Sequence, residues 1–185
     1  MGLFSRKKTE EPAQEPKDLL HVEQLTDKMA YAASIIYTEA WKDNYRSVLP
    51  LHFLSTISFA YFVDRLGDPW EDPYKEDLLL YEEDRTLGGM SVRHSTEEER
   101  PEDCEMTGIY VKPVFQRRGY GKRLLSDGLD VVKGRGYRKV FVWVMEKNTG
   151  GRAFLESQGF TDTGDTKSEV IGGEEIPMVR YEKNI

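Results

Sequence analysis

The most constraining feature of this 185-residue chain is a strand-like segment that leads through a loop with two closely spaced glycines into a helix-like segment. Cys104 to Val111 is typical of a strand, and Pro113 ends it. Gly119 and Gly121 open a predicted helix that runs to Lys133 on an apolar stripe at helical spacing. Free backbone N–H groups and the positive end of the helix dipole favour an anion at such a point. The order of these segments therefore predicts a phosphate or pyrophosphate site.

The charge distribution fits an anionic ligand at this loop. The whole chain carries a net charge of −7, but residues 112–139 hold nine basic and two acidic side chains, a local balance of +7. Residues 68–105 hold fourteen acidic and four basic side chains. This asymmetry indicates a polyanionic ligand on one side and a cationic one on the other. The alternative is that both segments are solvated faces of an acidic protein.

Length and composition exclude several other classes of protein. The length fits one domain, predicted over residues 19–185, after a disordered lead-in of residues 1–18 that has almost nothing to bury. The only cysteine, Cys104, excludes an intramolecular disulfide framework, and the three histidines are too scattered for a zinc site. No apolar stretch suffices for a membrane span or a secretory signal. We therefore expect a cytoplasmic protein with no metal and no membrane association.

Helical and strand-like periodicities alternate along the rest of the chain. The predicted helices are Thr26 to Asp43, Pro50 to Gly67 and Gly150 to Ser157. The predicted strands form a hairpin over 78–81 and 86–93, a central buried strand over Tyr137 to Met145, and a final hairpin over 166–171 and 176–182 that turns at Gly172-Gly173. The mixture predicts an α/β fold, a mixed sheet flanked by helices.

The glycine loop resembles the acetyl-CoA loop of the Gcn5-related N-acetyltransferases, the GNAT family. That loop has the form [Q/R]-x-x-G-x-[G/A], and its counterpart here is Gln116-Arg117-Arg118-Gly119-Tyr120-Gly121. The strand approach Ile109-Tyr110-Val111 and, downstream, Asn148 and Gly159-Phe160 are also similar to family segments. The strong resemblance covers Cys104 to Phe160, about a third of the chain.

The resemblance implies that the strands 104–111 and 137–145 splay apart to admit the pantetheine arm of acetyl-CoA. Val111 would offer main-chain groups to the pantetheine and its N–H to the thioester oxygen, where a preorganised donor stabilises the negative charge of acyl transfer. The amides of residues 117–122 would hold the pyrophosphate. The residues that the resemblance assigns to acetyl-CoA are Ile109, Tyr110, Val111, Gln116, Arg117, Arg118, Gly119, Tyr120, Gly121, Lys122 and Asn148.

Glu105 is the candidate catalytic base, because the attacking amine must be neutral and several family members carry a glutamate at this position. Strand alternation predicts that its side chain shares a face with Thr107 and Ile109. The alternative is that Glu105 simply belongs to the acidic run 97–105.

Leu155 departs from the family pattern, because many relatives carry there a tyrosine that protonates the departing thiolate. Either the thiolate leaves without this acid, or Tyr110 or a water substitutes for it, or the protein no longer catalyses. Cys104 is interpreted as a packing residue rather than a nucleophile, since no histidine or asparagine partner is near it in sequence.

The leading hypothesis is an acetyl-CoA-dependent N-acetyltransferase that acts on a small-molecule or peptide amine by direct attack. The alternative within the same fold is a non-catalytic protein that binds or senses acyl-CoA. A nucleic-acid partner is disfavoured by the net negative charge and by the absence of a stacking pattern among nearby aromatic residues. The exposed edge of the final hairpin could pair with a second subunit, so a homodimer is also an expectation.

Overall fold

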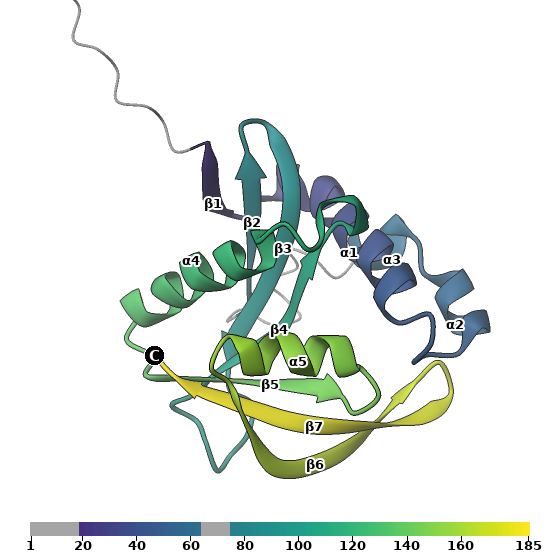
Figure 1. Ribbon diagram of the computed structural model, residues 1–185, viewed down its shortest axis with the longest axis vertical. Coiled ribbons are helices and arrows are strands. Elements are labelled where there is room, and N and C mark those ends of the chain that lie inside the picture. The colour runs from purple at the N-terminus through teal and green to yellow at the C-terminus, as the bar shows by residue number, and fades with distance from the viewer. Residues whose placement is uncertain (1–18, 64–74) are drawn as a thin grey trace, which may run out of the picture.

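A seven-stranded sheet forms the centre of the protein, in a computed structural model that describes residues 19–63 and 75–185 (Figure 1). Its strand order is β1-β2-β3-β4-β5-β7-β6. The strands are β1 (Leu20–Gln24), β2 (Glu76–Glu82), β3 (Arg85–His94), β4 (Cys104–Val111), β5 (Lys139–Met145), β6 (Thr161–Ile171) and β7 (Glu174–Asn184). Neighbours are antiparallel except β4 and β5. The predicted α/β fold with a mixed sheet is confirmed.

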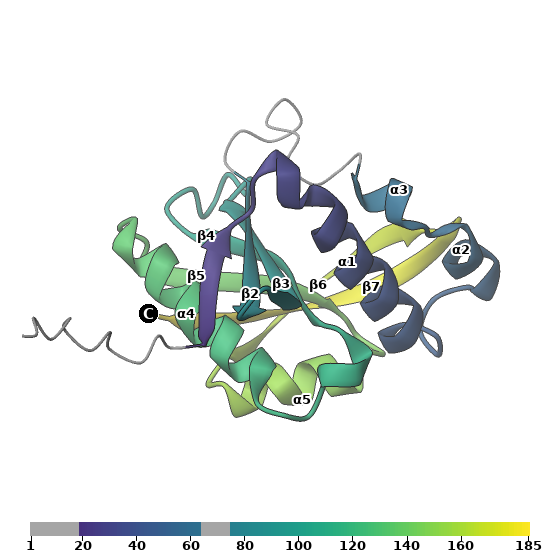
Figure 2. The same cartoon turned by 90° about the horizontal axis from the view of Figure 1, so that it is seen from above.

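Helices cover both faces of the sheet (Figure 2). On one face lie α1 (Ala30–Asn44), α2 (Leu51–Thr56) and α3 (Phe59–Val63), and on the other lie α4 (Tyr120–Gly134) and α5 (Thr149–Ser157). There are also two single turns of 3-10 helix. One, η1 (Asp27–Met29), precedes α1, and the other, η2 (Pro113–Phe115), follows β4. We call these two sides of the sheet the α1 face and the α4 face.

Side-chain alternation along the strands divides the interior into two hydrophobic cores. Leu80 of β2 packs into the core on the α4 face, and its neighbour Leu79 packs into the core on the α1 face. Val144 and Met145 divide in the same way on β5. The central strand is therefore buried on both sides, as its nearly continuous apolar sequence predicts.

The two central strands separate soon after they meet. Only the pairs Cys104↔Val140 and Glu105↔Phe141 join β4 to β5, although both strands continue for several residues beyond them. A parallel pair requires a long crossover, which α4 provides here. The predicted splaying of these strands is confirmed, and it leaves the last residues of β4 without a strand on their β5 side.

Two predictions about the N-terminal half need correction. The short strand β1 was not expected, and it pairs with β2 along Leu20↔Glu82 to Gln24↔Leu78. The helix predicted from Pro50 is two short helices instead, because Ile57 takes an extended conformation with φ −67° and ψ 121°. The predicted stop at Gly67 and the predicted lead-in 1–18 lie outside the described residues.

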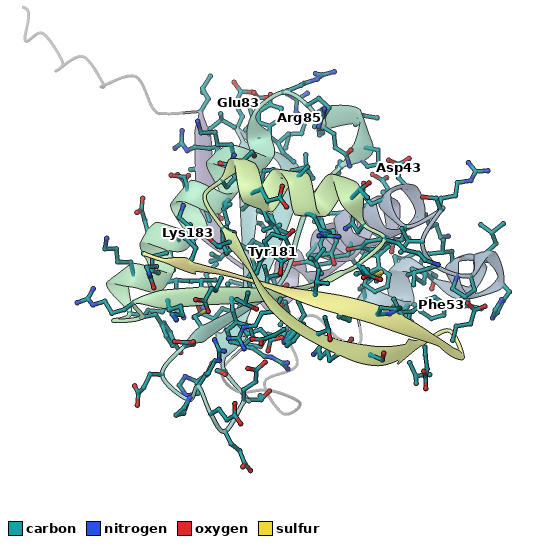
Figure 3. All side chains as sticks on the ribbon, turned by 60° about the horizontal axis from the view of Figure 1, so that its bottom comes forward. Asp43, Phe53, Glu83, Arg85, Tyr181 and Lys183 are labelled. Carbon is teal, nitrogen blue, oxygen red and sulfur yellow. The ribbon has the colours of Figure 1, made fainter. Side chains whose placement is uncertain are left out.

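The final hairpin is longer than predicted and turns where predicted. Gly172 and Gly173 have φ values of 64° and 84°, the left-handed conformation that a tight hairpin turn requires. The turn contacts α2, where His52 Nε2 lies 3.1 Å from Gly172 O and Phe53 packs beside it (Figure 3). Most of β6 is exposed along the sheet edge. The homodimer stays a prediction.

Candidate active site

The end of β4 turns main-chain polar groups into the gap left by β5. Lys112 N donates to Leu87 O at 2.9 Å, so residues 110 and 112 bond toward β3 in the antiparallel ladder. Alternation then directs the N–H and C=O groups of Ile109 and Val111 toward β5, which has already diverged. The resemblance assigns these groups to the thioester and the pantetheine, and that assignment stays a prediction.

Gln116 holds the strand end and the following loop together. Its Nε2 atom lies 3.1 Å from Val111 O and 3.2 Å from Asn44 Oδ1 at the end of α1. The side chain that was predicted to contact the cofactor therefore contacts the protein itself. Its position between β4 and α1 fixes where the loop begins.

The glycine loop has the geometry of an anion site. Arg117 and Gly119 have φ values of 61° and 87°, and Gly119 is the N-cap of α4. No side chain caps this helix and no acidic residue occupies its first turn. The first amides of α4 therefore have no side-chain acceptor of their own, and they carry the positive end of the helix dipole.

Gly121 faces both α5 and the end of β4. A Cβ atom placed on it would lie 3.6 Å from the Phe154 ring and 3.7 Å from Val111 Cγ2. These are ordinary contact distances, so a methyl group at this position displaces neither neighbour.

The turn between β2 and β3 braces the loop from a distant part of the sequence. Arg85 lies 5.1 Å from the centre of the Phe115 ring, and Arg118 lies 6.0 Å from it. Tyr120 donates its hydroxyl to Glu82 at 3.1 Å, and Arg85 also bonds to Glu82. The hydrogen bond from Arg85 lowers the pKa of Glu82 most, and the hydrogen bond from Tyr120 lowers it further. Figure 3 shows Arg85 at this turn.

Glu105 is buried and ion-paired. Its exposed fraction is 7%, and Arg93 Nε on β3 lies 2.7 Å from its Oε2 atom. Glu105 belongs to the last residue pair that joins β4 to β5, so it lies next to the point where the two strands separate. This position is compatible both with a base at the gap and with a structural ion pair.

A β-bulge corrects the predicted orientation of Glu105. Ser91 pairs with Gly108 and Val92 with Met106, so Thr107 is an extra residue in β4. The bulge shifts the alternation of all later side chains by one position.

Cys104 and Met106 lie in the core of the α4 face, and beyond the bulge Ile109 packs against that same core. Tyr110 lies in the core of the α1 face. Glu105 therefore shares the α1 face with Tyr110, and the prediction that it shares a face with Ile109 is wrong.

Tyr110 extends back along β4 over a glycine. A Cβ atom on Gly108 would lie 2.6 Å from Tyr110 Cε2, so only glycine accommodates the ring there. The Tyr110 hydroxyl lies 3.5 Å from that of Tyr45. Burial raises the pKa of Tyr110, and the hydroxyl is protonated at neutral pH.

Asn148 and Leu155 both have structural roles in α5. Asn148 Oδ1 accepts from Gly151 N at 2.9 Å and so caps the helix. Leu155 is 3% exposed and belongs to the core of the α4 face. The contact of Asn148 with a cofactor stays a prediction.

A buried arginine that the sequence analysis missed anchors the acidic loop beside Glu105. Arg180 is 2% exposed, and its Nη1 atom lies 2.5 Å from Glu97 Oε2. Trp143 Nε1 donates to the other oxygen of Glu97 at 2.9 Å, and the guanidinium stacks 4.0 Å from the Phe141 ring. The sequence did contain a signal for this role, because Arg180 is a basic residue flanked on both sides by apolar residues of β7.

Metal-binding clusters and membrane-spanning helices were both sought among the described residues. Within residues 19–63 and 75–185, no three His, Cys, Asp or Glu side chains come together as a metal site. None of the helices in these ranges is long and apolar enough to cross a membrane.

The parallel strand pair that separates beside a glycine-opened helix is the arrangement that the resemblance implied. The chain belongs to the acetyltransferase (GNAT) family, whose sequence profile matches residues 33–160.

Individual relatives agree with this assignment. The chain is 24% identical over 115 residues to the N-acetyltransferase YuaI of Bacillus subtilis, a match that covers 61% of this chain and 64% of that protein. It is 33% identical over 99 residues to a mycothiol acetyltransferase of Geodermatophilus obscurus, which covers 52% of this chain and 32% of that protein. The chain thus spans less than two thirds of these curated relatives.

A solved structure shows the same fold over nearly the whole chain. The PaiA N-acetyltransferase of Thermoplasma acidophilum, solved in complex with coenzyme A, superposes with a TM-score of 0.67 and 18% identity. The superposition covers 90% of this chain and 99% of that one.

Proposed function

We propose that this protein transfers the acetyl group of acetyl-CoA to a primary amine within a ternary complex. The observation that carries the proposal is the gap between β4 and β5, into which Ile109 and Val111 turn their main-chain polar groups. The glycine loop at the end of the same strand supports it, because a pyrophosphate there lets the thioester reach the gap.

The chain's own groups supply orientation and charge stabilisation. The amides at the start of α4 hold the pyrophosphate, and the Val111 N–H donates to the thioester oxygen as it becomes negative. The amine approaches from the α1 face as an ammonium ion, gives one proton to Glu105, and its neutral nitrogen then attacks the carbonyl carbon. The carbon–sulfur bond breaks, the sulfur leaves as the thiolate of CoA, and the second proton that the nitrogen loses passes to this thiolate.

Direct transfer is favoured over an acetylated enzyme by the state of the only thiol. Cys104 is buried in the core of the α4 face, and burial raises its pKa to about 12. Because the thiolate is the nucleophile, a thiol that stays protonated at neutral pH is a poor acyl carrier.

A non-catalytic acyl-CoA-binding protein is the second candidate, and Leu155 is the observation that favours it. An apolar core residue at this position donates no proton to a departing thiolate.

Thiol release from acetyl-CoA across a panel of small cationic amines and peptides distinguishes the two candidates. We expect release that depends on the acceptor, with intersecting initial-rate lines as a ternary complex requires. Calorimetric binding of acetyl-CoA without release for any acceptor would instead establish the binding protein. Absence of both binding and release would exclude the two together.

Leu155→Tyr tests the missing proton donor. The larger side chain overpacks the core, which costs roughly 1–3 kcal/mol and lowers Tm. We expect kcat to rise with an unchanged Kd for acetyl-CoA, because the phenol acts only in the transition state. If turnover stays the same while Tyr110→Phe reduces it severely, the donor is Tyr110.

Tyr120→Phe tests the brace between α4 and the β2–β3 turn. Loss of the hydrogen bond to Glu82 is expected to raise the Kd for acetyl-CoA, measured by calorimetry, because the start of α4 is then held less firmly against the turn. Tyr31→Phe, at a 58% exposed tyrosine on α1, is the control and should bind normally. Equal affinity in both variants would show that the brace does not shape the loop.

A further inference from the structure

The strand β6 forms one edge of the sheet, and among the described residues only β7 pairs with it (Figure 1). Residues 164–170 are all exposed, Val170 by 73%. Residues 166–171 pair with β7 without a register shift, so this part of the edge is regular. Edge strands are usually short, bent or covered, because an open edge pairs readily with another strand. The regular edge of β6 is thus suited to pairing.

Pro177 shows which main-chain groups of β6 point outward. Ser168 lies opposite Pro177, which has no N–H group and whose C=O group accepts from Glu146 N, just after β5, at 2.9 Å. Ser168 and Pro177 therefore exchange no hydrogen bonds. Since bonded and non-bonded pairs alternate along an antiparallel ladder, Thr166, Ser168 and Val170 all turn their N–H and C=O groups away from β7.

The charges of β6 are self-complementary about Ser168. When two copies of the strand run antiparallel with Ser168 opposite its own copy, Lys167 of each chain lies opposite Glu169 of the other. Within one chain, Lys167 Nζ lies 2.7 Å from Glu169 Oε1, and the side chains are 38% and 44% exposed. The four charges therefore alternate in sign across the junction, which favours this register.

Other two-fold registers with the same outward groups match less well. A centre at Thr166 brings the register shift between Asp162 and Thr166 into the contact. A centre at Val170 sets Lys167 opposite the turn residue Gly173 and leaves its charge without a partner across the junction. Ser168 is thus the centre that uses both the regular part of the edge and its charges.

We propose that two copies of this chain join through residues 166–170 of β6, antiparallel about Ser168, to form one continuous sheet. The outward groups of Thr166, Ser168 and Val170 then form about six main-chain hydrogen bonds with the second copy. The contact lies at the sheet edge, whereas the gap lies between β4 and β5. This inference is therefore independent of the proposed function.

Oxidation of Ser168→Cys tests the register. The Cα atoms of a directly opposed, hydrogen-bonded pair lie about 5.5 Å apart, a distance that a disulfide spans. The only native cysteine, Cys104, is buried, so the wild type gives the background. We expect most of the Ser168→Cys protein to become a covalent dimer that a reductant reverses. Thr161→Cys, at an exposed residue of the same strand, is the matched control and should stay monomeric, because its two copies lie more than about 40 Å apart.

Charge reversal tests the complementarity, by sedimentation velocity over a series of concentrations. Lys167→Glu sets carboxylates opposite each other and Glu169→Lys sets ammonium groups opposite each other, so each variant alone should raise the dimer Kd by roughly tenfold. A mixture of the two variants should form heterodimers, because every charge then meets its opposite. The double variant Lys167→Glu/Glu169→Lys should return to the wild-type Kd.

Two results would overturn the contact. One is a wild type that stays monomeric at every concentration, with no excess of covalent dimer in Ser168→Cys. The other is a dimer that neither charge reversal weakens, since a different surface would then join the copies. Acetyl-CoA affinity and Tm should match the wild type in all of these variants, which shows that they fold. Loss of the contact therefore leaves the proposed function standing, and failure of the wild type to bind acetyl-CoA leaves the contact standing.

Discussion

Gly121→Val is expected to reduce the affinity for acetyl-CoA by roughly 100-fold or more, or about 2.7 kcal/mol, in a calorimetric titration. The added isopropyl group enters the space beside Phe154 and Val111, which the proposed site assigns to the pantetheine and the pyrophosphate. Tm should change by only a few degrees, because the backbone at Gly121 is helical and a Cβ atom there meets its neighbours at ordinary contact distances.

Gly119→Val is expected to lose binding for a different reason. A Cβ atom at Gly119 meets nothing within 4 Å, but its φ of 87° is strained for any other residue by roughly 1–2 kcal/mol. This variant should therefore bind poorly and also melt earlier. Gly134→Ala, at the far end of α4 with open space around it, is the control and should bind normally. Undiminished affinity in both loop variants would refute the assignment of the site.

Glu105→Gln is expected to lower kcat/KM by roughly 10²-fold at neutral pH if Glu105 accepts the proton of the amine. The loss should shrink as the pH rises, because the acceptor amine then loses its proton in solution and needs no base. Acetyl-CoA affinity should stay the same, since Glu105 lies on the α1 face and the glycine loop is at the other end of β4.

Arg93→Gln separates this role from that of the ion pair. If the carboxylate serves only to balance Arg93, both variants should lower Tm alike, and any loss of rate should be independent of pH. If Glu105 is the base, Arg93→Gln keeps the characteristic pH profile and Glu105→Gln loses it. A pH-independent loss in Glu105→Gln would thus assign it a structural or electrostatic role.

Most elements of the fold could be predicted because their signals are local. The limits of β4 and the φ values at the turn Gly172-Gly173 follow from proline and glycine, which restrict or free the backbone regardless of tertiary contacts. The apolar stripe of α4 likewise indicates that one face of this helix is buried. The strand β1 was missed because five residues carry too weak a pattern, and pairing with β2 stabilises it.

Pairings between distant residues were decided only by the tertiary structure. Alternation gave the wrong partner face for Glu105, because the bulge at Thr107 depends on the register that β3 imposes. Arg85 approaches Phe115 across the end of the sheet, and Arg180 meets Glu97 across 83 positions of sequence.

The sequence by itself thus determined the glycine loop, the charge around it and the class of fold, since each depends on a contiguous run of residues. The tertiary structure decided which face of β4 carries Glu105, which groups turn toward the gap between β4 and β5, and which distant residues contact the loop. These features depend on strand register and on contacts between elements far apart in the chain, and a local pattern does not encode the partner that a side chain meets.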